Sequence, residues 1–333
     1  MRAAGFLALA AVVCLAGCAQ QRAVLDPVPN SRIVVMGNAF AERMPLYGWF
    51  EAALQARFPD RKLSVRNMGW SGDTPGLQPR ELNFGTMLEH LGAQRADIII
   101  AAYGMNESFD GPAGLEKFRT ELDVWVTSMQ AQRFNGHSAP QIILVSPIAH
   151  EDLGAPLPDG KAHNADLERY TRVMREVAAR RQVAFVDLFA PVRRKMAGKG
   201  PHLTTNGIHL NDYGYWWAAH EMSGQLGLAL GAPRASGDAT AAIAELRRAV
   251  WDKDWHFFLR WRPVNMEYIR GRRREPYGVE TFPREFEKLD QMVEERDRRI
   301  WAMPKPALGQ LWRSPPSGPA PWKTVPSYVN ADK

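Results

Sequence analysis

Short apolar runs alternate with longer amphipathic segments between residues 31 and 230. The runs are continuous rather than alternating, which is typical of parallel strands covered on both faces. They span residues 33–36, 63–65, 98–102, 142–145 and 183–186. Between the runs, apolar residues recur at intervals of three and four, as on one face of a helix. This alternation predicts an α/β fold, a three-layer doubly wound sheet of about five parallel strands.

The pattern changes after residue 230. Residues 231–238 are rich in Gly, Ala and Ser and indicate a boundary. Helix formers dominate from 241 to about 262, and residues 285–302 have a second helical pattern, so we expect 231–302 to form a helical C-terminal extension. The proline-rich tail, 303–333, is expected to be extended.

The first thirty residues predict a targeting segment. Arg2 precedes an apolar run that is too short to cross a membrane, and the run ends in Leu15-Ala16-Gly17-Cys18. This ending resembles the lipobox of bacterial lipoproteins. We therefore expect a signal peptide over 1–17, lipid on Cys18 and a linker over 18–30, although an ordinary secretory signal is the alternative. Lipid would hold the protein at a membrane of the cell envelope without spanning it, and Ala19 favours the outer membrane, on its periplasmic or surface side.

Composition excludes several classes of partner. The net charge of +6 is modest and the basic residues are interspersed with acidic ones, so we expect no binding to nucleic acid. The two cysteines, Cys14 and Cys18, fall in the signal and at the lipidation site, which leaves no intrachain disulfide. No His, Cys or carboxylate cluster has metal-ligand spacing, so we expect neither a metal nor a cofactor. Nothing in the sequence indicates an oligomeric state.

Four polar segments follow predicted strands. They are residues 37–39, 67–74, 104–107 and 206–209. In an open parallel sheet, ligands bind beyond the carboxyl ends of the strands. We therefore expect these segments to meet at one edge of the sheet.

In their order and content the four segments resemble the blocks of the SGNH (GDSL) hydrolase superfamily, over roughly residues 31–230. The resemblance implies a flavodoxin-like fold and hydrolysis of acyl or acetyl esters, including carbohydrate esters. In that family the first block is Gly-Asp-Ser, whose Ser is the nucleophile. Here Asn38 replaces the Asp and Ala39 replaces the Ser.

The remaining blocks imply an oxyanion site and a base. Gly72 matches the glycine whose backbone N–H binds the oxyanion. The third block begins at Gly104 and supplies Asn106 as a further donor, with Glu107 in place of the family's Asp. In the last block His209 matches the base, whereas Asn206 replaces the Asp that orients it.

These departures fall on the residues that perform covalent chemistry. Loss of the nucleophile in a serine hydrolase costs about 10⁶ in kcat. An Asp-to-Asn change at the orienting position costs about 10⁴ and favours the wrong imidazole tautomer. The sequence therefore predicts an ester hydrolase-like lipoprotein with a non-standard or inactivated site. The alternatives are a catalytically silent protein that binds a glycan or acyl ligand, and a scaffold whose 285–302 helix docks a partner chain.

Two residues offer other routes to hydrolysis. Ser71 is a second possible nucleophile, but a serine there also fits the ordinary second block. Glu42, three residues after Ala39, either activates water or forms an ion pair with Arg43 or another cation; we favour the ion pair.

Three further residues near the site are candidates for a role in it. His150 follows the fourth strand and either points into the crevice or is a hydrogen-bonded loop residue. Asp73 and Asp212 are substitute partners for His209, and Asp73 is alternatively a cap of the following turn.

Aromatic residues also have two interpretations. Trp70, Tyr103 and Phe109 adjoin site residues and either stack on sugar rings or belong to the core. The extension interleaves aromatic residues with arginines over 255–274, which indicates either a surface for polyanions or acidic glycans or a helical clasp packed against the hydrolase-like domain.

Overall fold

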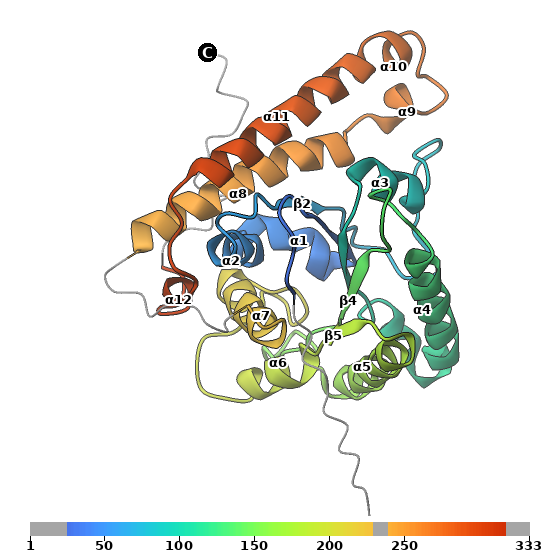
Figure 1. Ribbon diagram of the computed structural model, residues 1–333. Coiled ribbons are helices and arrows are strands. Elements are labelled where there is room, and N and C mark those ends of the chain that lie inside the picture. Colours follow the sequence, from blue (N-terminus) through green and yellow to red (C-terminus); the bar gives the residue numbers. More distant parts are fainter. Residues whose placement is uncertain (1–24, 229–238, 318–333) are drawn as a thin grey trace, which may run out of the picture.

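The computed structural model describes residues 25–228 and 239–317. Its centre is a five-stranded parallel sheet in the order β2-β1-β3-β4-β5 with helices on both faces (Figure 1). The strands are β1 (Arg32–Gly37), β2 (Ser64–Asn67), β3 (Ile98–Ala102), β4 (Gln141–Val145) and β5 (Ala184–Val186). The predicted α/β class and the parallel, doubly wound sheet are confirmed. The signal segment with Cys18, the first part of the linker and the end of the tail lie outside the described residues.

Both faces of the sheet are buried, which explains the continuous apolar runs. In β1, Ile33 and Val35 belong to one core and Val34 and Met36 to the other, and each is at most 3% exposed. The first core is covered mainly by α1 (Ala39–Tyr47), α2 (Trp49–Arg57), α6 (Phe189–Met196) and α7 (Asp212–Gln225). The second is covered by α3 (Met87–Gln94), α4 (Leu115–Gln130) and α5 (Lys161–Arg181).

Residues 239–317, here called the C-terminal arm, pack along the β2 edge of the sheet. Figure 1 shows its two long helices, α8 (Thr240–Trp261) and α11 (Phe282–Ala302), side by side. The buried Lys253 ammonium donates to the carbonyl of Val65 in β2, and the Trp301 indole N–H donates to the carbonyl of Leu63. The arm therefore covers an edge strand that would otherwise present unpaired backbone groups. This docked arrangement corresponds to the clasp interpretation.

Short elements complete the arm and correct one expectation. They are α9 (Met266–Ile269), α10 (Tyr277–Glu280) and α12 (Leu308–Leu311). The tail was expected to be extended, but α12 lies within it, because Leu308 and Leu311 are 2% and 1% exposed in the first core. Leu25, in the predicted linker, is also buried in that core and donates its N–H to the carbonyl of Leu226. Over 25–228 and 239–317, no helix is both long and apolar enough to cross a membrane.

Candidate active site

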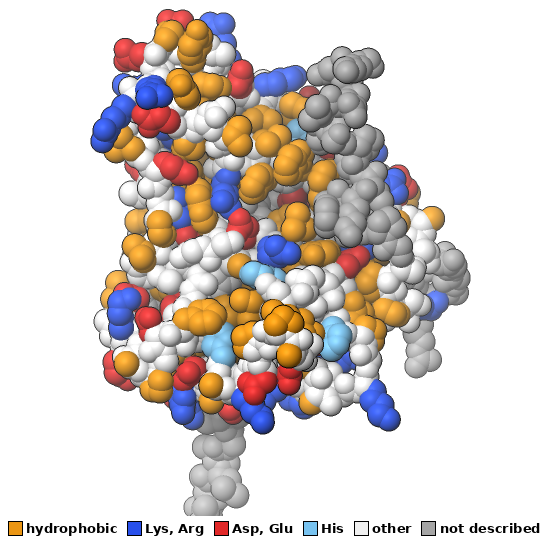
Figure 2. Space-filling model, turned by 180° about the vertical axis from the view of Figure 1, so that it is seen from behind, with side chains coloured by type: hydrophobic (Ala, Val, Ile, Leu, Met, Phe, Trp, Pro, Cys, Tyr) orange, Lys and Arg blue, Asp and Glu red, His pale blue; other side chains and the backbone are white. Residues whose placement is uncertain are grey.

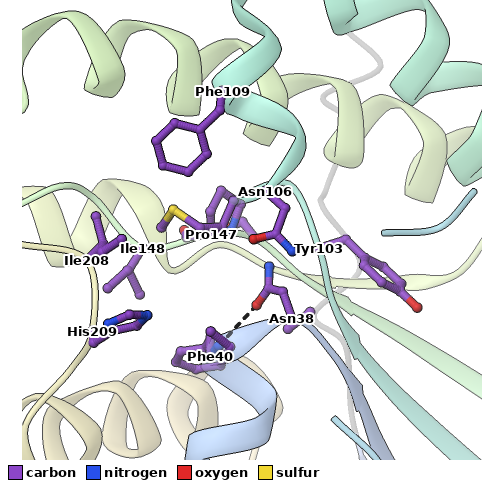
Figure 3. A pocket seen from close by; sticks show the side chains of 13 residues that line it. Asn38, Phe40, Tyr103, Asn106, Phe109, Pro147, Ile148, Ile208 and His209 are labelled. Carbon is purple, nitrogen blue, oxygen red and sulfur yellow. Dashed lines mark hydrogen bonds between the residues drawn. The ribbon is translucent and has the colours of Figure 1, made fainter. Parts of the chain in front are cut away.

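A small cavity of about 50 Å³ lies where β1, β3 and β4 end (Figure 3). Ala39, Asn106 and His209 all line it, so residues that are 170 positions apart in the chain meet as predicted. Gly72 does not line the cavity and is exposed to solvent. The expected convergence of four positions therefore holds for three of them.

The turn from β1 into α1 places Ala39 at the cavity wall. Gly37 has a φ of +119°, and a Cβ there would lie 2.0 Å from the carbonyl oxygen of Ala102, so only glycine fits. Asn38 caps α1, because its Oδ1 accepts the Phe40 N–H at 3.1 Å. The N–H of Ala39, in the first turn of this helix, has no acceptor among the described residues. The nucleophile position thus presents a methyl group and a free backbone donor.

The Asn206 side chain fixes the tautomer of His209. Its Oδ1 accepts the backbone N–H groups of His209 at 3.0 Å and Ile208 at 3.4 Å, so its amide nitrogen faces the imidazole. That nitrogen lies 3.0 Å from His209 Nδ1, and an amide nitrogen can only donate. Nδ1 is therefore unprotonated and the proton resides on Nε2. Burial lowers the pKa of His209, and the positive charge of Arg43 lowers it further, which favours the neutral ring.

A neutral imidazole with its proton on Nε2 cannot act as the family's base. In a serine hydrolase, Nε2 needs a free electron pair to remove the hydroxyl proton. Figure 3 shows the His209 ring facing the cavity, where it presents a donor instead. The amide nitrogen of Asn38 also points into this region, toward Asn106.

Asn106 secures the second-block loop. Its amide nitrogen donates to the carbonyl of Ser71 at 2.9 Å and to that of Asp73 at 3.0 Å, which uses both of its hydrogens. To donate to an oxyanion, Asn106 would have to release one of these bonds. In this structure the donors at the cavity are instead the Ala39 N–H, the Asn38 amide and the His209 Nε2–H.

Glu42 and Ser71 lie outside the cavity and contact each other. The Ser71 hydroxyl donates to Glu42, whose other oxygen pairs with the Arg262 guanidinium of the C-terminal arm. The predicted ion pair therefore forms with Arg262, whose guanidinium lies 4.0 Å from the ring centre of Trp70. Because Glu42 does not line the small cavity and both of its oxygens are engaged, its proposed action on water at the nucleophile position has no geometric support.

The substitute partners for His209 are occupied elsewhere. Asp73 is fully buried and forms two bonds of 2.7 Å with Arg80; burial raises its pKa, against the opposing effect of Arg80. Asp212 accepts from the Trp49 indole and the Arg247 guanidinium, each at 2.7 Å. Both expectations of a carboxylate beside His209 are wrong, since within the described residues the hydrogen-bond partner of the ring is the Asn206 amide.

Glu107 serves the turn that follows β3. Its carboxylate accepts the Gly104 N–H at 2.8 Å, and burial raises its pKa to about 7. Gly104 itself has a φ of +92°, which favours glycine. Gly104 and Glu107 therefore hold the turn of the third block in shape, and Asn106 is the residue of the three that lines the cavity.

His150 belongs to a partly buried hydrogen-bonded cluster. Its Nδ1 lies 3.0 Å from His163 Nδ1, and His163 Nε2 lies 2.7 Å from the Ser108 hydroxyl. No sequence pattern indicates this Ser–His contact. Ser108 donates its only hydrogen to the Met105 carbonyl, so His163 must donate to Ser108, and the hydroxyl is 1% exposed. Burial lowers the pKa of His163 to about 4. The cluster does not constitute a nucleophile with its base.

The aromatic neighbours divide between core and cavity. Tyr103 is fully buried against Trp125 and is a core residue, although it borders the cavity. Trp70 packs edge-on against Phe84 and Trp261. In contrast, Phe109 is 64% exposed at the cavity mouth.

A second, larger pocket adjoins the site and was not predicted. Its volume is about 260 Å³, and it lies between the hydrolase-like domain and α8. Its walls include Glu42, Arg43 and Ser71 on one side and Trp251, Trp255 and Phe258 on the other. In the part of the chain that the structure describes, no three His, Cys, Asp or Glu side chains are grouped to hold a metal.

Several solved structures resemble this fold. A gut microbial diltiazem-metabolizing enzyme is 21% identical, with 62% of this chain and 49% of that one covered and a TM-score of 0.48. This chain thus spans about half the length of that enzyme. An acetylxylan esterase from Geobacillus stearothermophilus is 17% identical over 61% of this chain and 97% of its own, with a TM-score of 0.47.

The sequence comparisons assign the family. No curated protein matches the chain. The model of the GDSL-like lipase/acylhydrolase family matches residues 37–217, which is more than half of the chain and includes the first, second, third and last blocks. With the sheet order and the cavity at its carboxyl edge, this match identifies the chain as a member of the GDSL-like lipase/acylhydrolase family.

Proposed function

We propose that this protein is an esterase-like binding protein, which holds the acyl group of an ester and does not cleave it by serine chemistry. One observation carries the proposal: the Asn206 amide donates to His209 Nδ1 beside a nucleophile position that is Ala39. The hydrogen bond from Asn206 leaves His209 unable to act as the base, and alanine at position 39 has no atom that can attack the ester.

The groups that remain suit a carbonyl oxygen. The Ala39 N–H, the Asn38 amide and the His209 Nε2–H are all donors around one cavity, and a carbonyl oxygen accepts through two lone pairs. Donors of this kind bind an acyl oxygen even where no covalent step follows. The cavity has room for about four small atoms, since each water-sized occupant needs about 10–15 Å³ by this measure. An acetyl group fits that volume.

The cellular place of the protein is part of the proposal. Cys18 at the end of an apolar signal supports lipid attachment in the cell envelope. Labelling with an alkyne-tagged fatty acid should mark the protein in membranes, and Cys18→Ser should abolish the label. An unchanged label in that variant would contradict the anchor.

Binding without turnover is tested with a small intact ester. Saturation-transfer NMR with ethyl acetate should show contact between the acetyl methyl and the protein, while the ester concentration stays equal to that in buffer. Ala39→Leu adds three carbon atoms to the cavity and should abolish the signal; the same addition at the exposed Ala197 is the control. No signal in the wild type would refute binding. Hydrolysis above the buffer rate that disappears in His209→Ala would refute the silent site.

A further inference from the structure

The pocket between α8 and the hydrolase-like domain, here called the arm pocket, has one aromatic wall. Trp251, Trp255 and Phe258 are spaced four and three residues apart, so they lie on one face of α8. Their rings are nearly parallel, with interplanar angles of 4° and 13° and centre separations of 5.9 and 5.7 Å. Trp251 is buried, Trp255 is half-buried and Phe258 is 36% exposed. The row therefore leads from the core to solvent.

The opposite wall is polar and charged. It contains the Glu42 carboxylate, the Ser71 hydroxyl and the Arg43 side chain. Arg43 Nε and Trp255 Nε1 are buried donors with no hydrogen-bond acceptor in this structure, which is costly. Both residues line the arm pocket, and these two nitrogen atoms are themselves covered by neighbouring protein atoms.

Ser71, in the wall of the arm pocket, is hydrogen-bonded to Asn106, which lines the small cavity. Its hydroxyl bonds to Glu42 in the arm pocket, while its carbonyl accepts from Asn106 at the rim of the small cavity. On the face shown in Figure 2, hydrophobic side chains gather in the upper middle, with charged side chains among and around them and histidine side chains below. The lining of the arm pocket likewise combines aromatic rings with charged and hydroxyl groups, so one ligand can contact both kinds of wall.

We propose that the arm pocket binds a neutral pyranose sugar, which is the alcohol part of an O-acylated glycan whose acyl group occupies the small cavity. The inference rests on the proposed function and extends it to the ligand class. The C–H groups of a pyranose face carry partial positive charge and pack on the negative face of an aromatic ring. Its hydroxyl groups both donate and accept, which matches Glu42, Ser71 and Arg43.

The same chemistry disfavours two other ligand classes. A hydrocarbon chain would leave Glu42 and Arg43 in contact with apolar atoms, which is unfavourable for charges. A polyanion would meet the carboxylates of Glu42 and Asp254, both of which line the arm pocket. A neutral polyhydroxylated ring has neither conflict.

The test is a calorimetric titration of the full chain against gluco-, xylo-, galacto- and manno-configured tetrasaccharides, each free and mono-O-acetylated. We expect at least one configuration to bind, with the acetylated form binding more tightly. Trp255→Ala and Phe258→Ala should each weaken that binding about tenfold or more. Tyr277→Ala, at a 59% exposed aromatic residue of the same arm, should leave it unchanged. Melting curves confirm that each variant is folded.

The outcomes separate this inference from the proposed function. Failure of every tetrasaccharide to bind, or equal binding by the wild type, Trp255→Ala and Phe258→Ala, overturns the sugar site even if ethyl acetate still binds the small cavity. Binding of a sulfated tetrasaccharide alone also overturns it. If Ala39→Leu binds the free and acetylated sugars as the wild type does, the result supports the sugar site and refutes binding of the acyl group in the small cavity.

Discussion

Lys253 joins the C-terminal arm to the hydrolase-like domain, and its replacement by methionine is the most informative perturbation of the fold. The side chain is fully buried. Its ammonium donates to Glu51 at 2.7 Å, to the Val65 carbonyl at 2.8 Å and to Asp254 at 2.6 Å, which satisfies all three hydrogens. Methionine has a similar shape and leaves the two carboxyl groups and the carbonyl without their donor.

The expected loss follows from the burial of this group. Removing one partner of a buried, hydrogen-bonded ion pair costs about 3–5 kcal/mol, because the charge that remains, here on Asp254, stays buried and uncompensated. We therefore expect Lys253→Met to lower the free energy of unfolding by about 3–5 kcal/mol at pH 7. The matched control, Lys288→Met on the exposed surface of α11, should change it by less than about 0.5 kcal/mol.

Urea unfolding followed by tryptophan fluorescence measures both variants. A shift in the midpoint with an unchanged slope would indicate a change in stability rather than in the surface exposed on unfolding. A loss below about 1 kcal/mol for Lys253→Met would refute the reasoning. It would mean that the arm is held mainly by its apolar contacts.

Three further variants test single features. Burial raises the pKa of Glu51 to about 8, whereas its ordinary value is 4.5, so between these values the folded state holds a proton that the unfolded state lacks. The free energy of unfolding should therefore fall as the pH rises from about 5 to 8. Glu51→Gln should flatten this dependence. Gly37→Ala should cost about 3 kcal/mol or more and yield little soluble protein, because its Cβ would lie 2.0 Å from the Ala102 oxygen at a φ of +119°; normal yield and melting would contradict this. Asn206→Asp should move the His209 proton to Nδ1 and raise its pKa from the present lowered value, as read by ¹⁵N NMR titration; an unchanged tautomer would argue against the assigned hydrogen bond.

The sheet could be predicted from the sequence because its strands are buried on both faces. Runs such as 98–102 coincide with β3 (Ile98–Ala102), and the order of the polar segments at strand ends placed Ala39, Asn106 and His209 at one cavity. The role of Asn206 was also predictable, since an amide three residues before a histidine reaches its ring nitrogen. These features depend on local pattern and on the topology of a parallel sheet.

Contacts between distant segments could not be predicted. Glu42 pairs with Arg262, which is 220 residues away, and sequence spacing gives no indication of such a partner. The aromatic residues of α8 were recognised, but their position opposite Ser71 depends on how the arm docks. Gly72 matched the second block and still lies outside the cavity; the contact between this loop and the site is made by the Ser71 and Asp73 carbonyls, which accept from Asn106.

The most direct test of the central claim restores the two missing groups and measures ester turnover. If the pocket is intact and only the nucleophile and the orienting acid are absent, Ala39→Ser with Asn206→Asp should hydrolyse phenyl acetate. The wild type and the Ala39→Ser single variant should stay at or near the buffer rate. A double variant no faster than buffer, although folded, would contradict the claim that these two substitutions alone silence the site. So would a wild type that already turns over the ester.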